Sequence, residues 1–469
     1  MADEVKDPSK VYANPTKRFF VEMLTRDIEV RDAILDLLDN CVDGILRSIE
    51  GQEDAPQPYA GFEARIDFNE HEFSIKDNCG GISKDIARYK AFLMGRIDDK
   101  RDKDLRTVGM YGIGMKRAIF KLGRSCVVSS YTKDEAFKIE ISPDWMTKDD
   151  SWELKLEDIE TKDKTGTDIY ITNFPQHITE FFANGKSIYV ELPKVIGQHY
   201  SFILNKGFKV YVNGKDIEPD NISILVSPTG DLVENSISPY MYRGIIDEVN
   251  VRLIVGFYRP MPDDDEIEDN IVARRSSEDA GWTIVCNDRV VLFNDRTILT
   301  GWGDSPVPSF HNQFIGINGI VFFDSTVAEK LPLTTTKRGV DGSSHLYLQV
   351  KNFMKEGLKK FTDFTNYWKA FANEEKQYSQ NAVAKDVFEL AKIEPDKNWK
   401  KLKDRDEWKL NLDLRRPIVQ DADPLKQIKY FKKQSEILAI QQVHYAGEAV
   451  KPSEIGQFCF EYVLDEIKK

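Results

Sequence analysis

The stretch from Arg31 to Gly44 constrains this chain most, because acidic and apolar residues alternate there with a helical period. At about 100° per residue, its polar residues fall on one stripe, namely Asp32, Asp36, Asp39, Asn40 and Asp43. A solvated helix face usually mixes lysine with glutamate, and this stripe has no lysine. The pattern favours a packed helix whose polar face holds a cation or polarises water. An ordinary solvated face is the alternative.

Composition bounds the possible classes of protein. A chain of 469 residues predicts two or three domains. It has no apolar run long enough to span a membrane and no apolar signal region near Met1, so we expect no membrane contact. The five cysteines are scattered without a C-x-x-C pair, which argues against a zinc site and predicts reduced thiols and a cytoplasmic location.

The net charge of −13 argues against a surface built mainly to bind nucleic acid. The excess acidity lies in residues 1–350, whereas residues 351–469 carry a small positive balance. A polyanion contact is therefore more plausible at the C-terminal end.

Two glycine turns follow the acidic helix. A predicted strand at residues 72–76 runs into Asp77-Asn-Cys-Gly-Gly-Ile82, where a carboxylate ends the strand and glycines let the backbone approach a ligand. After the charged stretch Gly95–Val108, the sequence Gly109-Met-Tyr-Gly-Ile-Gly-Met-Lys116 opens an apolar helix. Bare N–H groups, the helix dipole and a lysine suit a phosphate there.

Beyond Phe181, strands and then helices are expected. An Asn-Gly turn within residues 208–215 and Asn287-Asp-Arg predict hairpins. Leu331–Gly339 reads as a basic turn, and residues 262–269 as an acidic loop. Strands are expected at 64–68, 126–131, 136–141, 164–171, 249–257 and 314–323, and helices at 188–204, 346–372, 382–391, 424–440 and 452–468.

The order of these motifs resembles the GHKL ATPases, which include DNA gyrase B, the ninety-kilodalton heat-shock chaperone, MutL and MORC proteins, and histidine kinases. The match covers residues 31–171, where an Asp/Asn helix, Asp-Asn-x-Gly-Gly, Gly-x-x-Gly-x-Gly-x-Lys and Gly-Thr before a strand follow one another. The resemblance implies an α/β (α+β) fold of the Bergerat type that binds ATP and Mg²⁺ between helices and sheet. It also implies that residues 83–108 form a lid.

Roles follow from the resemblance, position by position. Asp36 would activate the attacking water and Asn40 would ligate Mg²⁺. Asp77 would accept a hydrogen bond from the adenine amino group, with Thr167 at the same edge and Gly81 close to the base. The remaining nucleotide-binding positions would be Gly109, Gly112, Ile113, Gly114, Met115 and Lys116.

The sequence departs from the family pattern at two positions. Aspartate replaces the usual glutamate at Asp36, which shortens the reach of the base and predicts slow hydrolysis. Cys79 stands where glycine is common, and Gly80 can supply the flexibility there.

The second half resembles the ribosomal-protein-like β-α-β transducer domain that follows the ATPase in MutL, gyrase B and MORC. The turn Thr334-Thr-Thr-Lys-Arg-Gly339 resembles the transducer loop whose lysine reaches the terminal phosphate, which would make Lys337 a phosphate sensor. An exposed basic turn is the alternative. The expected organisation is an N-terminal docking arm (1–24), an ATPase domain (25–183), a transducer (184–345) and a helical C-terminal region (346–469).

We therefore expect an Mg-dependent ATPase that acts as a switch and forms a homodimer in its ATP state. A DNA or protein client is possible, and the MORC and MutL likeness suggests a DNA-related or phage-defence process by analogy. The alternative is a nucleotide-gated interaction or chaperone-like module with negligible turnover, which the short side chain of Asp36 keeps open.

Overall fold

The computed structural model describes residues 16–53, 55–95, 105–107, 109, 112–148, 151–227, 237–262, 279–334, 337–371, 375, 382–402, 406–410, 414, 416–417 and 426–469. The chain divides into two compact units, Met1–Arg416 and Pro417–Lys469. Most of the predicted docking arm, most of the charged stretch before Gly109 and residues 263–269 of the acidic loop lie outside the described residues.

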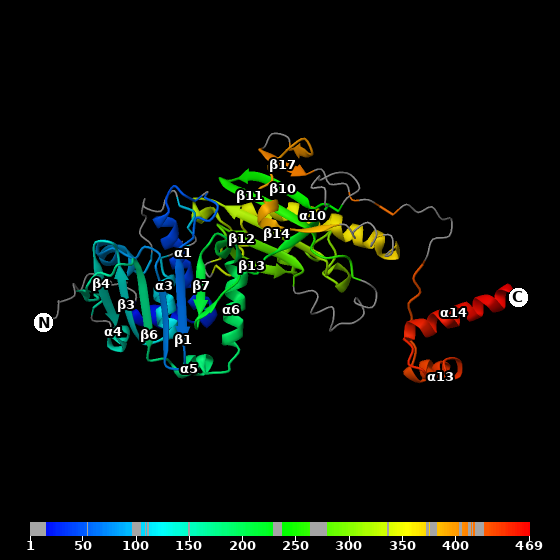
Figure 1. Cartoon of the computed structure of the whole chain (residues 1–469), viewed down its shortest axis with the longest axis horizontal. Coiled ribbons are helices and arrows are strands. Elements are labelled where there is room, and N and C mark those ends of the chain that lie inside the picture. The colour runs from blue at the N-terminus through cyan, green and yellow to red at the C-terminus, as the bar shows by residue number, and fades with distance from the viewer. Residues whose placement is uncertain are drawn as a thin grey trace, which may run out of the picture. The chain divides into compact units, whose positions relative to one another are not determined.

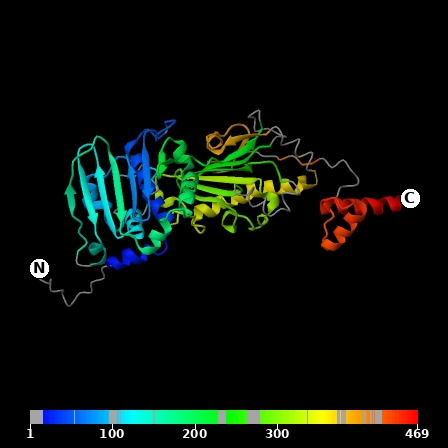
Figure 2. The same ribbon diagram turned by 60° about the horizontal axis from the view of Figure 1, so that its bottom comes forward.

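The first layer of the larger unit is an eight-stranded sheet in the order β5-β4-β3-β6-β2-β1-β7-β8 (Figures 1 and 2). Neighbouring strands are antiparallel except β1 and β7, which run parallel. The strands are β1 (Glu63–Phe68), β2 (Glu72–Asp77), β3 (Ser125–Tyr131), β4 (Ala136–Ile141), β5 (Leu156–Asp158), β6 (Gly166–Thr172), β7 (Lys209–Val212) and β8 (Lys215–Asp216).

Helix α1 (Val30–Ser48) packs against α3 (Gly114–Leu122), and both contribute to the core of this sheet. The apolar arc of α1 is buried, as its period predicts. The helix begins at Val30, after Glu29, and Glu29 makes no side-chain capping hydrogen bond. Shorter helices are α2 (Lys84–Ile86), α4 (Pro143–Thr147) and α5 (Gln176–Phe182), with π-helical turns at Phe19–Met23 and Ala87–Ala91.

The predicted domain boundary at residues 183 and 184 lies inside this first layer. Helices α6 (Ile188–His199) and α7 (Ser201–Asn205) contribute to the first core, and β7 pairs with β1. The prediction placed the boundary too early because β7 reaches its partner strand only after two intervening helices. The first layer extends to about Ile217, the last residue of that core.

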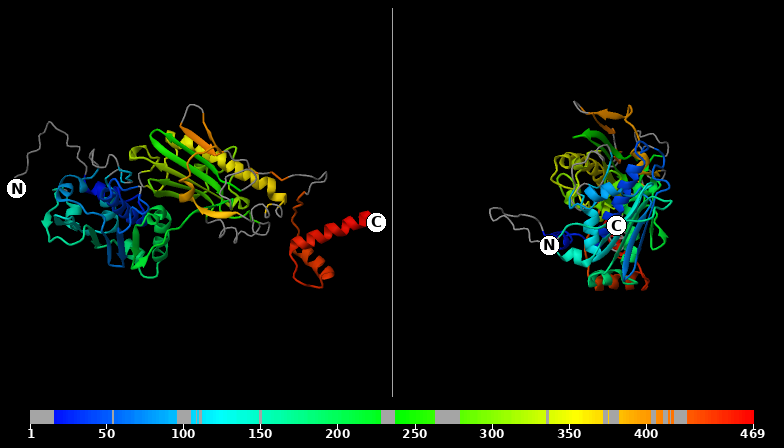
Figure 3. Two further views of the ribbon diagram at one scale, coloured as in Figure 1. Left: turned by 45° about the horizontal axis from the view of Figure 1, so that its top comes forward. Right: turned by 90° about the vertical axis from the view of Figure 1, so that its left-hand side faces the viewer.

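The second layer is a seven-stranded sheet in the order β13-β12-β14-β11-β10-β17-β16. Its strands are β10 (Tyr240–Ile246), β11 (Val249–Phe257), β12 (Gly281–Cys286), β13 (Arg289–Asp295), β14 (Ile317–Asp324), β16 (Trp399–Lys401) and β17 (Glu407–Leu410). Helix α10 (His345–Trp368) packs on β10, β11 and β14 (Figure 3). A transducer role for this layer stays a prediction.

The helical prediction for residues 346–469 is only partly right. Residues 382–391 form β15 (Val383–Asp386) and α12 (Val387–Leu390), and β15 pairs with β9 (Ser223–Val226). Strands β16 and β17 extend the second sheet, because β17 pairs with the edge of β10. A free sheet edge offers unpaired backbone groups that recruit a strand, and the local sequence does not reveal such a partner.

The smaller unit holds α13 (Gln434–His444) and α14 (Pro452–Lys468), which meet through aromatic contacts of His444 and Tyr445 with Phe458. Helix α13 begins ten residues later than the start predicted at Pro424. None of the described helices has the length and apolar character needed to cross a bilayer. At the other end of the chain, Lys17 is buried and donates to Trp145 O at 2.8 Å, so this part of the predicted arm is docked.

Candidate functional site

A cavity of about 450 Å³ lies among α1, the turn after β2, and the start of α3. All twelve residues that the sequence proposed for the site line it, although they come from five separate segments. They are Asp36, Asn40, Asp77, Gly81, Gly109, Gly112, Ile113, Gly114, Met115, Lys116, Thr167 and Lys337. We call the part around Asp77 the Asp77 end and the part around Asp36 and Asp39 the acidic end.

Three donors fix the Asp77 carboxylate at its end of the cavity. The backbone N–H groups of Cys79 and Thr167 donate to Oδ1 at 2.8 and 3.3 Å, and the Cys41 thiol donates to Oδ2 at 3.5 Å. Burial raises the pKa of Asp77 to about 6, although these hydrogen bonds lower it. The carboxylate is thus a pre-positioned acceptor in a largely dry site.

Glycine is required at Gly81 for a geometric reason. Its φ is 73°, in the left-handed region, and a Cβ there would lie 2.2 Å from Tyr131 O. The turn therefore packs tightly on the sheet and leaves the cavity open above it. Cys79, which departs from the family pattern, is buried beneath this turn, and Gly80 has a φ of 101°. The flexibility that the turn needs is thus supplied next to Cys79.

The second glycine turn leads directly into a helix. Gly112 has a φ of 64°, and α3 begins at Gly114 without a side-chain cap, so no capping side chain occupies its first N–H groups, and the first residues of α3 line the cavity. Lys116 is buried and donates to Ala91 O at 2.9 Å and to Gly112 O. Burial lowers the pKa of Lys116 to about 8. A phosphate would find a helix N-terminus and a poorly solvated lysine together.

Asn40 is exposed toward the cavity, and its amide nitrogen donates to Asp36 O at 2.9 Å, which leaves the amide oxygen as the atom able to bind a cation. Among the described residues no cluster of three or more His, Cys, Asp or Glu side chains could hold a metal ion. The single amide oxygen of Asn40 fits Mg²⁺, which commonly takes one or two protein ligands and completes its shell with phosphate oxygens and water.

Asp36 and Asp39 of the polar stripe of α1 are buried and paired with the chain's own cations, so this part of the stripe is not a solvated face. Asp36 and Asp39 are 3% and 2% exposed. The Arg117 guanidinium donates to Asp36 Oδ2 at 2.5 Å, and Lys337 Nζ lies 3.8 Å from Asp36 Oδ1. One turn away, Arg338 pairs with Asp32 at 2.7 Å.

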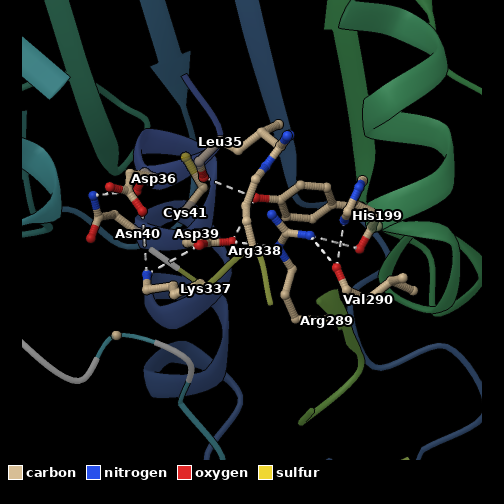
Figure 4. A network of polar contacts seen from close by, with 12 residues as sticks. Leu35, Asp36, Asp39, Asn40, Cys41, His199, Arg289, Val290, Lys337 and Arg338 are labelled. Carbon is tan, nitrogen blue, oxygen red and sulfur yellow. Dashed lines mark hydrogen bonds and ion pairs between the residues drawn. The ribbon is translucent and has the colours of Figure 1, made fainter. Parts of the chain in front are cut away.

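Asp39 is the most connected residue of the acidic end (Figure 4). Its Oδ1 accepts from the Tyr200 hydroxyl at 2.5 Å and from Arg289 Nε at 2.9 Å, and its Oδ2 accepts from Lys337 Nζ at 3.1 Å. Burial raises the pKa of Asp39, but Lys337 and Arg289 together hold it well below its usual range. The carboxylate is therefore charged and fully paired.

The side chain of Lys337 is placed by tertiary structure and not by a local preference. Its backbone φ is 54°, a region that lysine rarely adopts. The residue is buried, and it lies 298 positions after Asp39 in the chain. Burial lowers its pKa, but Asp39, Asp36 and Asp43 raise it further, so the net pKa lies above its ordinary value. Lys337 is thus a charged lysine at the wall of the cavity.

The turn between β12 and β13 also contacts the first layer. Asn287 Nδ2 donates to Thr107 O at 3.1 Å, just before the second glycine turn, and to Ser325 O at 2.9 Å. Next to it, Asp288 pairs with Lys206 at 2.5 Å. In that glycine turn, Gly109 N donates to Asp43 Oδ2 at 3.2 Å.

Sequence reasoning missed four residues of the site: Arg117, Tyr200, Arg289 and Arg338. Arg117 directly follows the lysine of the second glycine turn, and Arg338 follows Lys337, so adjacency gave a weak signal for both. Tyr200 and Arg289 gave none, because they lie 161 and 250 positions from Asp39.

Comparison with protein families places this geometry in a known class. Residues 28–170 match the family described as histidine kinase-, DNA gyrase B-, and HSP90-like ATPase. The matched segment includes α1 and the two glycine turns, and the match supports a GHKL-type ATPase module in this part of the chain. No curated protein matches the chain.

Proposed function

We propose that this protein is an Mg-dependent ATPase that acts as a molecular switch. The observation that supports it most is the convergence of the twelve proposed residues on one cavity, including Lys337 from the second layer. A lysine from the turn before α10, placed beside the acidic face of α1, is what a sensor of the terminal phosphate requires.

In this proposal the Asp77 end takes the adenine base. Asp77 accepts the amino N–H, Thr167 supports the same edge, and Gly81 leaves room for the ring. The second glycine turn, Gly109 to Lys116, takes the phosphates with backbone N–H groups and the Lys116 ammonium. Asn40 ligates Mg²⁺, which neutralises phosphate charge and orients the oxygens.

Asp36 is the proposed base for the attacking water. It lies at the acidic end, and a Cβ at Gly114 would be only 3.4 Å from its carboxyl carbon, so the backbone of the phosphate turn comes close. Its ion pair with Arg117 holds the carboxylate in one orientation but also occupies Oδ2. Asp39 is a poor substitute, because three donors already use both of its oxygens.

Lys337 is the proposed switch contact. In the structure its partner is Asp39, and a terminal phosphate would offer a second, competing anion. ADP lacks that anion, so the two nucleotides differ in the state they favour. Closure of residues 83–108 as a lid and ATP-dependent homodimerisation complete the switch, as members of this superfamily commonly dimerise.

A second function, a nucleotide-gated interaction module with negligible turnover, is favoured by one contact. The 2.5 Å pair between Arg117 and Asp36 would compete with proton abstraction by the same carboxylate. The client is proposed only by class: DNA, as for MutL and MORC relatives, or a protein. A role in phage defence rests on analogy with the superfamily.

Phosphate release with Mg-ATP, measured for the parent and for Asp36→Asn, tests the ATPase. We expect turnover to fall by about 10²–10⁴ in the variant while ATP affinity stays the same, because a general base contributes that much. Asp36→Glu should keep or raise the rate, since the longer side chain extends the reach of the base. Binding without turnover in the parent would favour the interaction module, and an Asp36→Asn variant as fast as the parent would assign the base elsewhere.

A further inference from the structure

Arg289 lies far from the cavity in sequence and does not line it, yet it contacts the partner of Lys337. Its Nε donates to Asp39 Oδ1, on the opposite side of the carboxylate from Lys337 (Figure 4). The guanidinium carbon lies 4.2 Å from the centroid of the Tyr200 ring. The residue is 1% exposed, and its remaining contacts go to the carbonyls of His199 and Val290. Arg289 therefore compensates the charge of Asp39 independently of Lys337.

Electrostatics gives this arrangement a consequence for switching. A buried carboxylate that loses its cation is strongly destabilising, whereas one that keeps a second cation is not. If Lys337 were the only partner of Asp39, its transfer to a phosphate would leave a bare buried charge. With Arg289 in place, Asp39 stays paired after the transfer.

We propose that Arg289 is a positioning residue that sets how readily Lys337 leaves Asp39 for the terminal phosphate of a nucleoside triphosphate. This inference rests on the proposed function, since it concerns the same lysine. It adds a second contact point between the layers, the β12–β13 turn, to the turn that carries Lys337.

The geometry of the turn supports this role. Asn287 and Asp288 have φ values of 47° and 64°, the left-handed pair of a two-residue hairpin, and Cys286 pairs with Arg289 across it. The contacts of Asn287 with Ser325 hold the turn. Arg289 is therefore presented to α1 from a rigid element and does not have to move with the nucleotide.

The test uses the full chain and compares affinities for a non-hydrolysable ATP analogue and for ADP, both with Mg²⁺. In Arg289→Met, which keeps length without charge, Lys337 should stay with Asp39. Analogue affinity should then fall about tenfold while ADP affinity changes less than about twofold, within the usual range of coupling between sites. Asp288→Asn is the matched control, because it removes an ion pair of the same turn and leaves Asp39 untouched.

The double variant Arg289→Met with Asp39→Asn tests whether the effect of Arg289→Met comes from the lost charge or from the changed shape of the side chain. Removing both charges frees Lys337, so preference for the analogue should return to within about threefold of the parent. Thermal unfolding of each variant checks that the chain is folded, and the double variant carries the test if the single one unfolds.

Three results decide between the ideas. Parent-like discrimination in Arg289→Met would overturn the inference, and so would a double variant that stays as impaired as the single one. Loss of discrimination in Asp288→Asn would also overturn it, because the effect would belong to the interface in general. If the parent itself did not distinguish the analogue from ADP, the proposed switch would fail and not only the role of Arg289.

Discussion

The Asp77 end and the acidic end differ in how far their parts are separated along the chain. Asp77 is held by Cys79, Cys41 and Thr167, which lie 2, 36 and 90 positions away, all within the matched ATPase segment. Asp39 is held by partners that lie 161, 250 and 298 positions away. The first end is thus a property of one domain, and the second exists only while two layers stay together.

This difference predicts separable behaviour. A change at the Asp77 end should affect every adenine nucleotide alike, because all of them share the base. A change at the acidic end should depend on the number of phosphates, because only a triphosphate offers Lys337 a new partner. The predictions below test that division, beginning with the largest expected effect.

Asp77→Asn should abolish or nearly abolish binding of both ATP and ADP. The substitution replaces a carboxylate acceptor by an amide that can present N–H groups to the adenine amino group, and a lost bond to a charged buried group costs about 2–3 kcal/mol, or about 30- to 150-fold in affinity. Titration calorimetry with each nucleotide measures it. Unchanged affinity for either nucleotide would mean that adenine does not bind at Asp77. The proposed division between the two ends would then be wrong.

Lys337→Ala should weaken binding of a non-hydrolysable ATP analogue by about 5- to 150-fold and leave ADP affinity nearly unchanged, the range usual for coupled sites. The physical reason is the lost charge-assisted bond to the terminal phosphate. Sedimentation velocity should show fewer dimers in the analogue. Lys330→Ala is a suitable control, because this nearby lysine pairs with Glu248 and does not line the cavity. Equal dimerisation of parent and Lys337→Ala would make Lys337 a structural ion-pair partner only.

Nucleotide affinity should also fall at both low and high pH, because a different group titrates in each range. We call these two decreases the acid limb and the alkaline limb. Below pH about 6 Asp77 is protonated and loses its full acceptor strength, so affinity should fall as pH falls through its pKa. Above pH about 8 Lys116 is neutral and must take up a proton to meet a phosphate, so affinity should fall as pH rises through its pKa. Because one proton is exchanged in each case, affinity should change by at most about tenfold per pH unit.

Adenosine separates the two limbs, because it carries the base without phosphates. It should show the acid limb alone, while ADP shows both. Lys116→Arg should remove the alkaline limb for ADP, since guanidinium stays protonated in proteins. An alkaline limb that persists in Lys116→Arg would mean that another group near the phosphates titrates.

Sequence reasoning succeeded where a pattern is repeated or local. The period of the acidic helix, the strand that ends at Asp77 and the hairpin turns at Asn213-Gly214 and Asn287-Asp288 are all present in the structure. It failed where an element depends on a distant partner. Strand β17 exists because β10 has an open edge, and β7 joins the first sheet because β1 accepts it in parallel.

By itself the sequence predicted the likeness to the GHKL ATPases, which the match over residues 28–170 supports, and it named twelve residues that line the cavity, because glycine turns and a helix stripe are set by local spacings. Only the tertiary structure decided what neutralises the acidic face of α1. Charge compensation in a buried site depends on distance in space, and Arg289 and Lys337 come within about 3 Å of Asp39 only after two sheets have folded against each other.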